Sequence, residues 1–297
     1  MSPHTLALYT KYWSLFKEFC KSLGVSPLPA SSLTVEAYMT FHVTSKASTT
    51  LPQVLAAITH YHARDHLPSP AQSTGVLRAM EGAKRGYGQP TVPRAVMTPE
   101  ILCSAILLAT KPSTSFVVVH TVWRMLIEFY GLLRFREVAE LLVTDFTFDS
   151  HGCHIYIKRS KTDQRGVGAS VRILYHTDPA VCPVRFTKMY IARLGYTQES
   201  MLPSLKGVTP CSNTPLSYHT AFKDLRKVLK NIGIDGSLFG EHSGRRGGTT
   251  CAAAAGVSHT ALKQQGRWKS DASVERYTEN SVQARHEFAS ALARRDI

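Results

Sequence analysis

The sequence predicts a mainly α-helical protein with a small antiparallel β-sheet, an α+β fold divided into two domains. Apolar residues recur at helical spacing over long stretches, the period changes to two in a short central region, and a segment rich in glycine and proline follows residue 87. The length of 297 residues also suits two domains, because single domains usually contain about 100–200 residues.

Residues 1–87 are predicted to form four short helices. Thr34 is the expected N-cap of the second helix, and the third helix should stop before Leu67-Pro68-Ser69-Pro70. Residues 88–97 are predicted to be a linker. The apolar positions that define the four helices are Leu6, Tyr9, Trp13, Phe16 and Leu23; Val35, Tyr38 and Met39; Leu51, Val54, Leu55, Ile58 and Tyr61; and Val76, Leu77, Met80 and Ala83.

The second predicted domain covers residues 98–297. It begins with Thr98 as a cap, Pro99 in the first turn and Glu100 near the positive end of the helix. The elements expected next are a helix near 116–130, another around Glu137 to Leu142, and strands at 146–148, 153–157 and 171–175, the last two joined by a loop with Gly166 and Gly168.

From Pro183 onward the pattern is predicted to be helical again. Gly256 is the expected stop of an alanine-rich helix, and Ser258 the cap of the next one. Gly247 and Gly248 lie early in the alanine-rich helix, where we expect them to allow a neighbouring backbone to approach closely. The tail from Ser281 to Arg295 is predicted to be a last amphipathic helix, starting at about 281.

The charge balance indicates a polyanionic partner. Lys and Arg number 35 against 21 Asp and Glu, which gives a formal net charge of +14. Nucleic acid is the commonest partner of so basic a protein, and a solvated basic surface is the alternative. The apolar share of 43% argues against wholesale disorder.

An intracellular protein without a membrane span is expected, in the nucleus if the source is eukaryotic. The longest apolar stretch, 116–135, contains four charged or titratable residues and fits a buried helix better than a span. The six cysteines lie far apart without a C-x-x-C pair, and the first residues do not resemble a signal peptide.

Five short motifs in the second domain carry the candidate chemistry. Each of them alone has an ordinary explanation, because an arginine followed by a glutamate is usually a helix salt bridge, a hairpin lysine is usually solvated, and a tyrosine near a tryptophan is usually core. Their order and spacing together are what matter. The motifs are Gly131-Leu132-Leu133-Arg134-Phe135-Arg136-Glu137, Lys158-Arg159-Ser160-Lys161-Thr162-Asp163-Gln164, His242-Ser243-Gly244-Arg245, Gly266-Arg267-Trp268 and Arg276-Tyr277-Thr278.

In this combination the chain resembles the tyrosine recombinases, the family of phage lambda integrase and Cre. Tyr130 to Asp145 resembles the first arginine box, 159–162 the hairpin lysine motif, Glu241 to Gly247 the H-x-x-R box, and Gly266 to Tyr277 the closing segment. The Gly-Leu-Leu-Arg and Ser-Lys-Thr-Asp-Gln forms are closest to the recombinases of eukaryotic DIRS and Crypton mobile elements. The match covers most of 120–280 and, more weakly, 1–87.

The resemblance implies a helical core-binding domain and a catalytic domain that form a C-shaped clamp on double-stranded DNA. It also implies site-specific recombination or integration through a 3′-phosphotyrosyl intermediate, for a mobile element. No metal or other cofactor is implied, and His60, His62 and His66 do not share one helix face as metal ligands would. We expect a homotetramer on DNA and a monomer or weak dimer in free solution.

The implied roles suit the chemistry of a phosphodiester. Two arginines provide fixed donors for the phosphate oxygens, a histidine and a lysine can transfer protons, and the tyrosine hydroxyl can attack phosphorus. Arg136 and Arg246 stand close to the two candidate arginines, but the spacing to Glu137 and His242 selects Arg134 and Arg245. The implied catalytic residues are Arg134, Lys161, His242, Arg245, Trp268 and Tyr277, with Glu137 in support.

Seven further residues are candidates for DNA contact, because they are basic or lie in segments that resemble DNA-binding parts of the family. They are Lys46, His62, Arg64, Lys84, Arg85, Arg159 and Arg246. Two alternative functions stay open on sequence: DNA relaxation by a type IB topoisomerase, and DNA binding by a domesticated protein that no longer cleaves. The compact helical unit at 1–87 favours a recombinase over a topoisomerase, and all six catalytic positions are filled.

Overall fold

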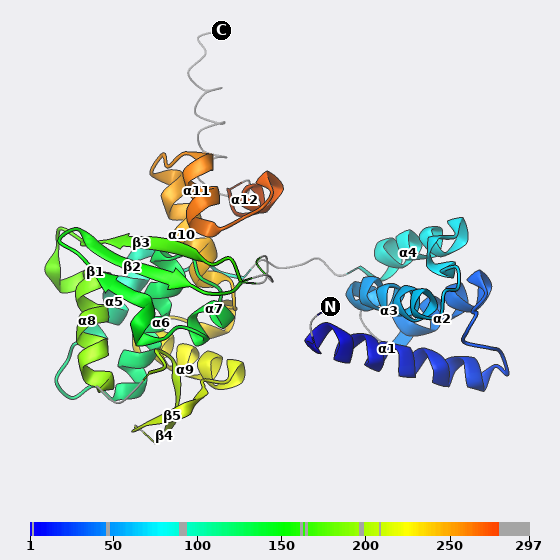
Figure 1. The fold of residues 1–297 in the computed structure, drawn as a ribbon, viewed down its shortest axis with the longest axis horizontal. Coiled ribbons are helices and arrows are strands. Elements are labelled where there is room, and N and C mark those ends of the chain that lie inside the picture. The colour runs from blue at the N-terminus through cyan, green and yellow to red at the C-terminus, as the bar shows by residue number, and fades with distance from the viewer. Residues whose placement is uncertain are drawn as a thin grey trace, which may run out of the picture. The chain divides into compact units, whose positions relative to one another are not determined.

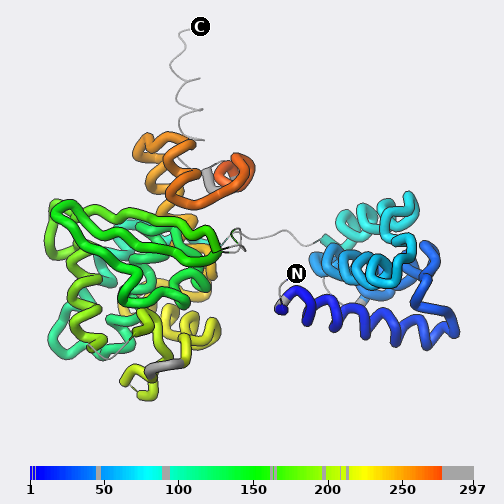
Figure 2. Tube along the Cα trace, in the orientation of Figure 1, coloured from blue at the N-terminus to red at the C-terminus, as the bar shows by residue number. Residues whose placement is uncertain are grey.

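The computed structural model describes residues 1, 3–45, 48–88, 94–160, 163, 166–195, 199–207 and 209–278. The chain divides into two compact units, Met1–Val92 and Pro93–Ile297 (Figure 1). Each unit has a hydrophobic core of its own, and Figure 2 traces the chain through both. Within the described residues, none of the helices combines the length and the apolar character that crossing a membrane requires.

Four α-helices make up most of the described part of the first unit, as predicted: α1 (Pro3–Ser22), α2 (Ser32–Ser45), α3 (Leu51–Arg64) and α4 (Thr74–Tyr87). Aromatic side chains join α1 to α3, since the rings of Trp13 and Tyr61 stack with centroids 4.7 Å apart. The predicted cap of α2 is wrong. Ser31, not Thr34, supplies the capping oxygen, because its Oγ accepts a hydrogen bond from the Thr34 backbone N–H at 3.0 Å.

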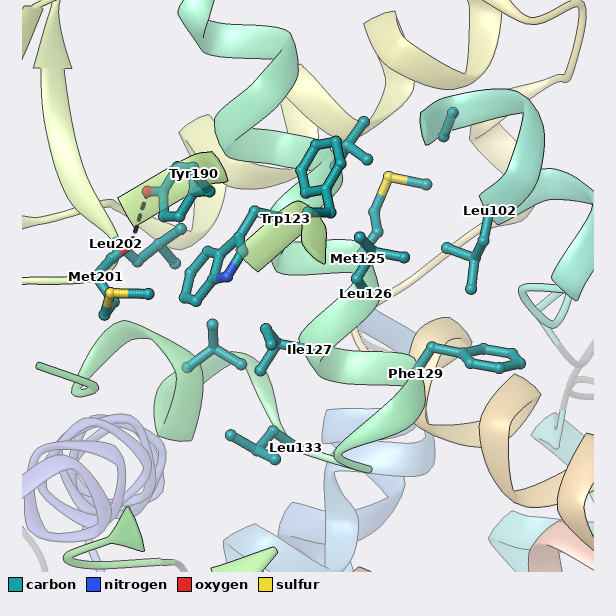
Figure 3. Packing of buried hydrophobic residues seen from close by; sticks show 14 of the residues in the cluster. Leu102, Trp123, Met125, Leu126, Ile127, Phe129, Leu133, Tyr190, Met201 and Leu202 are labelled. Carbon is teal, nitrogen blue, oxygen red and sulfur yellow. Dashed lines mark hydrogen bonds between the residues drawn. The ribbon is translucent and has the colours of Figure 1, made fainter. Parts of the chain in front are cut away.

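The second unit is built around α6 (Phe116–Tyr130), a helix buried over most of its length. Its Trp123 ring stacks on Tyr190 at 4.6 Å, and the Tyr190 hydroxyl donates to the Met201 carbonyl at 2.7 Å (Figure 3). Thr98 caps the preceding helix, α5 (Pro99–Ala109), as predicted. The short helix α7 (Phe135–Ala139) begins and ends earlier than the predicted 137–142.

The predicted antiparallel sheet is confirmed, with strand order β1-β2-β3. Its strands are β1 (Phe146–Phe148), β2 (Gly152–Ile157) and β3 (Ala169–Leu174). Ile155 pairs with Val171 and both side chains are buried in the core. The hairpin loop between β2 and β3 contains Gly166 and Gly168, whose φ angles are +71° and +80°.

A second, two-stranded sheet was not predicted. Strands β4 (Pro203–Lys206) and β5 (Thr209–Pro215) form an antiparallel hairpin after α8 (Pro183–Leu194), where the sequence indicated only helix. These strands contain three prolines and few apolar residues, so they lack the alternation on which a strand prediction depends. The hairpin lies at the opposite end of the unit from α11 and α12 in Figure 1.

Four helices complete the described part of the second unit: α9 (Tyr218–Asn231), α10 (Ser243–Ala254), α11 (His259–Gly266) and α12 (Asp271–Thr278). Helix α10 packs closely on its neighbours through glycines, as expected. A Cβ atom on Gly247 would lie 1.9 Å from the Met97 carbonyl oxygen, and one on Gly248 would lie 2.1 Å from that of Phe129. Ser258 caps α11 as predicted, and the tail helix predicted from about 281 lies outside the described residues.

Candidate active site

The first arginine motif forms a closed turn at the start of α7. Arg134 is the N-cap residue, and its backbone N–H donates to Glu137 Oε2 at 2.8 Å. The Arg134 Nη1 atom lies 2.7 Å from Glu137 Oε1. The three-residue spacing therefore lets one carboxylate hold both the backbone and the guanidinium of Arg134. The Arg134 side chain keeps 17% of its surface exposed, whereas Glu137 is buried.

Glu137 also attracts two arginines from distant parts of the chain. Arg267 Nη2 lies 2.7 Å from Glu137 Oε2, and Arg245 Nη1 lies 4.0 Å from the same oxygen. Burial raises the pKa of Glu137, but the charges of Arg267, Arg134 and Arg245 and the bond from the Arg134 backbone outweigh it, so that the pKa lies below its usual value. One carboxylate thus holds three guanidinium groups together.

Arg245 lies in the first turn of α10 and is almost fully buried. Its Nη1 donates to the Leu132 carbonyl at 2.5 Å, and its Nη2 donates to the Gly266 carbonyl. Its guanidinium carbon lies 4.3 Å from the centre of the Trp268 ring. A guanidinium has five N–H donors, so it is the burial of Arg245, more than these two bonds, that limits its contact with a phosphate oxygen.

Trp268 follows a left-handed residue at the end of α11. Arg267 has a φ of +55°, and the Trp268 backbone N–H donates to the Lys263 carbonyl at 3.1 Å. The indole is 7% exposed and packs in a small cluster with Leu132, Leu262 and Val274. This packing places the indole as a wall beside Arg245.

The H-x-x-R motif has an exposed and a buried end. His242 is the N-cap residue of α10 and is exposed. Three residues later, Arg245 points into the protein, one turn further along the chain. The motif therefore presents a histidine at the surface while its arginine is held beneath it.

Lys161 lies outside the described residues, but the hairpin loop that carries it is partly defined. The Asp163 backbone N–H donates to Ser160, both to the carbonyl and to Oγ, at 3.1 Å. The Asp163 carboxylate accepts from the backbone N–H groups of Val167 at 3.2 Å and Gly168 at 2.8 Å. Asp163 thus closes the loop on its β3 side.

Tyr277 lies on α12, and its backbone is described. Its side chain is outside the described part, as is that of Lys161. Of the six predicted catalytic residues, the structure brings together the side chains of Arg134, Arg245 and Trp268, with Glu137 between the arginines. The roles of all six stay predictions.

The prediction that His62 contacts DNA is wrong for this structure. His62 is fully buried in the first unit, where its Nδ1 bonds to the Ile58 carbonyl at 2.8 Å. Its Nε2 accepts from the Ala30 backbone N–H at 3.0 Å. Both ring nitrogens therefore bond to backbone groups inside the first unit. His62 is a candidate because its segment resembles a DNA-binding part of the family, but such a resemblance does not determine which face of the helix a side chain occupies.

The other candidate DNA contacts lie at or near the surface where the structure describes them. Arg64 is exposed beside Asp65, and Lys84 lies 2.7 Å from Glu81. Arg85 and Arg159 are exposed, and the half-buried Arg246 donates to the Arg94 carbonyl at 3.0 Å. Lys46 is outside the described residues. These positions stay candidates.

Two features were missed from the sequence. One is Arg267, which stands between Gly266 and Trp268 in a motif that was noted only for its tryptophan. The other is a basic cleft of about 640 Å³ next to Glu241, the residue before His242. It is lined by Arg94, His219, Lys223 and Arg226 with three aromatic rings. Among the described residues no group of three or more His, Cys, Asp or Glu could hold a metal ion.

The known proteins to which this chain is similar are recombinases and integrases. An integrase/recombinase XerD homologue from Selenomonas ruminantium is 28% identical over 282 residues, which cover 94% of this chain and 82% of the relative. No protein-family model matches the chain.

Solved structures of tyrosine recombinases share this fold at low sequence identity. The XerH site-specific recombinase in a post-cleavage complex with palindromic difH has a TM-score of 0.63 at 15% identity, covering 92% of this chain and 75% of that one. The Tn1549 transposon integrase with circular-intermediate DNA has a TM-score of 0.65 at 13% identity (98% and 94%). A lambda integrase tetramer on a Holliday junction has a TM-score of 0.60 at 13% identity (94% and 72%).

Proposed function

We propose that this protein is a tyrosine recombinase, that it cleaves and rejoins DNA at specific sites, and that it serves a mobile genetic element. The observation that carries the proposal is the cluster in which Glu137 holds Arg134, Arg245 and Arg267 beside Trp268. Such a cluster of fixed guanidinium groups suits a phosphodiester, whose transition state concentrates negative charge on the non-bridging oxygens. The relative and the structures named above are recombinases and integrases.

In the proposed reaction Tyr277 attacks phosphorus through its hydroxyl oxygen. A bond forms between this oxygen and phosphorus, and the bond from phosphorus to the 5′ oxygen breaks, leaving a 3′-phosphotyrosyl protein. His242 takes the tyrosine proton and Lys161 gives a proton to the departing 5′ oxygen. The phosphodiester energy is kept in the new bond, so the reverse reaction can rejoin a strand.

The arginines differ in what they can do without rearrangement. Arg134 is partly exposed and reaches solvent from the start of α7, so it is suited to bind the phosphate directly. Arg245 is buried against the carbonyls of Leu132 and Gly266. We propose that DNA binding brings a phosphate oxygen to the Arg245 guanidinium, with Trp268 as the wall of the site.

The partner is double-stranded DNA, and the working assembly is a homotetramer on two paired sites. The charge of +14 supports the first part, since contacts with phosphates release counterions and favour binding. The lambda integrase neighbour is a tetramer on a Holliday junction, and strand exchange between two duplexes needs four cleavage sites. In this proposal both units contact the duplex.

Covalent trapping tests the function. The protein is incubated with a pool of nicked duplexes whose central sequence is randomised. Because of the nick, cleavage releases a short fragment that dissociates, and religation fails. We expect a protein–DNA adduct on denaturing gels, enriched for one sequence. Two copies of the selected sequence on separate duplexes should then give recombinant products. Relaxation of supercoiled plasmid without recombinants would indicate a topoisomerase instead, and binding without adduct would indicate a protein that no longer cleaves.

A further inference from the structure

Arg267 is a buried arginine that the reaction scheme leaves without a role. Its side chain is 8% exposed, and it ends α11 in the left-handed region at a φ of +55°. Its Nη2 lies 2.7 Å from Glu137 Oε2 and donates to the Leu132 carbonyl at 3.1 Å. Its Nη1 donates to the carbonyls of Gln265 at 2.9 Å and Gly131 at 3.4 Å. One guanidinium thus joins α11, α7 and the 131–132 turn.

The partners of Arg267 are also the partners of the two candidate catalytic arginines. Glu137 uses its other oxygen, Oε1, to hold Arg134 at 2.7 Å. The Leu132 carbonyl, which accepts from Arg267, also accepts from Arg245 Nη1 at 2.5 Å. Arg267 also precedes Trp268, whose ring lies against Arg245. A change at Arg267 would therefore reach Arg134, Arg245 and Trp268 together.

Arg267 also helps to keep the carboxyl group of Glu137 ionised. A buried carboxylate is unfavourable unless it is paired, and desolvation raises the pKa of Glu137. The charge of Arg267 opposes this rise most strongly, followed by contacts with Arg134 and then Arg245. Without Arg267, Glu137 would become protonated more easily, and a neutral carboxyl would hold Arg134 more weakly.

We propose that Arg267 is a positioning residue for DNA cleavage, which fixes Glu137 and the 131–132 turn and thereby holds Arg134 at the phosphate. In this proposal Arg267 does not touch the phosphate itself, because each of its two Nη atoms already makes two bonds, to Glu137 and to three backbone carbonyls. The proposal rests on the proposed recombinase function. It extends the arginine pair of the sequence motifs to a triad that shares one carboxylate.

The test compares Arg267→Met, Arg267→Lys, Glu137→Gln and the double variant Glu137→Gln/Arg267→Met. Arg193→Met is the control, because Arg193 is an exposed arginine in the last turn of α8. Single-turnover cleavage of a selected nicked duplex is measured at saturating protein over a range of pH, together with DNA affinity and thermal unfolding. Arg267→Met should slow cleavage by roughly 10–100-fold at neutral pH with DNA affinity nearly unchanged.

The pH profile separates positioning from a structural role. In Arg267→Met the cleavage rate should fall further on mild acidification, because Glu137 takes up a proton. This additional fall at acidic pH, the acid limb of the profile, should be absent in the double variant, which has no carboxylate at position 137. Arg267→Lys keeps the charge and should recover part of the rate without the acid limb. An Arg267→Met enzyme with the wild-type rate and pH profile would overturn the proposal. So would a loss confined to DNA affinity, which would make Arg267 a DNA contact.

A measurement without DNA tests the coupling between Arg267 and Glu137 independently of the proposed recombinase function. It also gives a result in the wild type and in Arg267→Lys if Arg267→Met does not fold. Carbon-13 NMR of labelled glutamate carboxyls, with Glu137 assigned by its absence in Glu137→Gln, gives the Glu137 titration directly. We expect a titration below the usual glutamate range in the wild type and in Arg267→Lys, and a higher one in Arg267→Met. An ordinary titration in the wild type would refute the coupling, whereas a wild type that cleaves no duplex in the pool would refute only the recombinase function.

Discussion

Glu137 contacts arginines from three of the sequence motifs of this protein: Arg134, Arg245 and Arg267. Its pairing with Arg134 follows from a three-residue spacing and could be predicted from the sequence, because side chains three apart on a helix are neighbours. Its contact with Arg267 joins residues 130 positions apart and depends on how α11 packs on the 131–132 turn. No local pattern encodes such a contact, so Arg267 was missed.

The proposed division of labour between Lys161 and Arg134 gives a prediction at the residue scale. Lys161→Ala should cleave an ordinary duplex slowly, since the 5′ alkoxide is a poor leaving group without a proton. A duplex with sulfur in place of the bridging 5′ oxygen should restore most of the rate, because a thiolate leaves without protonation. Arg134→Ala should stay slow on both duplexes, since charge stabilisation is still missing. Equal rescue of the two variants in single-turnover assays would contradict the assignments.

His120 gives a second prediction, on stability. Burial in α6, together with the nearby charge of Arg124, lowers the pKa of His120 to about 4 from the usual 6.5, in spite of an opposing backbone contact at Pro203. Between these values the unfolded chain binds the proton and the folded one does not, so stability falls as the pH falls from 7 to 5. The expected loss from this group is about 2 kcal/mol. Between pH 7 and 5, the free energy of unfolding measured in urea should fall less in His120→Leu than in the wild type. An equal fall in both proteins would count against the assignment.

At the scale of elements, the sequence predicted the helices with long apolar stripes and the three-stranded sheet, but not the hairpin of β4 and β5. A long apolar run identifies α6, because most faces of this helix are buried. The two hairpin strands have little apolar alternation, and their pairing is made by backbone bonds and by packing near Met201 and Leu202. The predicted cap at Thr34 was wrong because α2 already begins at Ser32, where Ser31 accepts from the Thr34 backbone N–H.

Helix α10 yields a prediction on packing. Alanine favours a helix over glycine by about 1 kcal/mol, but a Cβ on Gly248 would lie 2.1 Å from the Phe129 carbonyl oxygen, which cannot move without its helix. Overpacking of this kind typically costs about 1–3 kcal/mol, so Gly248→Ala should lower the free energy of unfolding. Gly82→Ala in α4 is the control and should stabilise slightly, because a Cβ there meets no atom within 4 Å. Stabilisation of both variants in urea unfolding would show that α10 is not closely packed.

At the scale of the whole molecule, the proposed reaction requires a basic protein that acts as an assembly on DNA. Basic residues outnumber acidic ones in the whole sequence. Each of the two units has its own hydrophobic core, made of a separate cluster of apolar residues. Sequence could predict the two cores and the charge, because both are sums over many residues. It could not predict which exposed cations would be tied to carboxylates, as Arg64 and Lys84 are.

The tail gives a prediction about assembly. Residues 281–295 carry Ala284, Phe288, Ala291 and Leu292 at helical spacing, and we propose that this stripe docks into a neighbouring protomer, a head-to-tail contact that closes into a ring. Truncation after Asn280 should leave single-site binding near normal in gel-shift assays while abolishing pairing of two sites and recombination. Recombination at the wild-type rate by the truncated protein would mean that the tail packs on its own domain.

The identity of the nucleophile tests the central claim most directly. The covalent adduct trapped on a nicked duplex is digested with protease and nuclease, and the modified peptide is identified by mass spectrometry in parallel with a Tyr277→Phe protein. The account predicts a nucleotide on Tyr277 in the wild type, and no adduct from Tyr277→Phe at unchanged DNA affinity and thermal stability. An adduct at the wild-type level from Tyr277→Phe, or one mapped to another residue, would contradict the proposed mechanism.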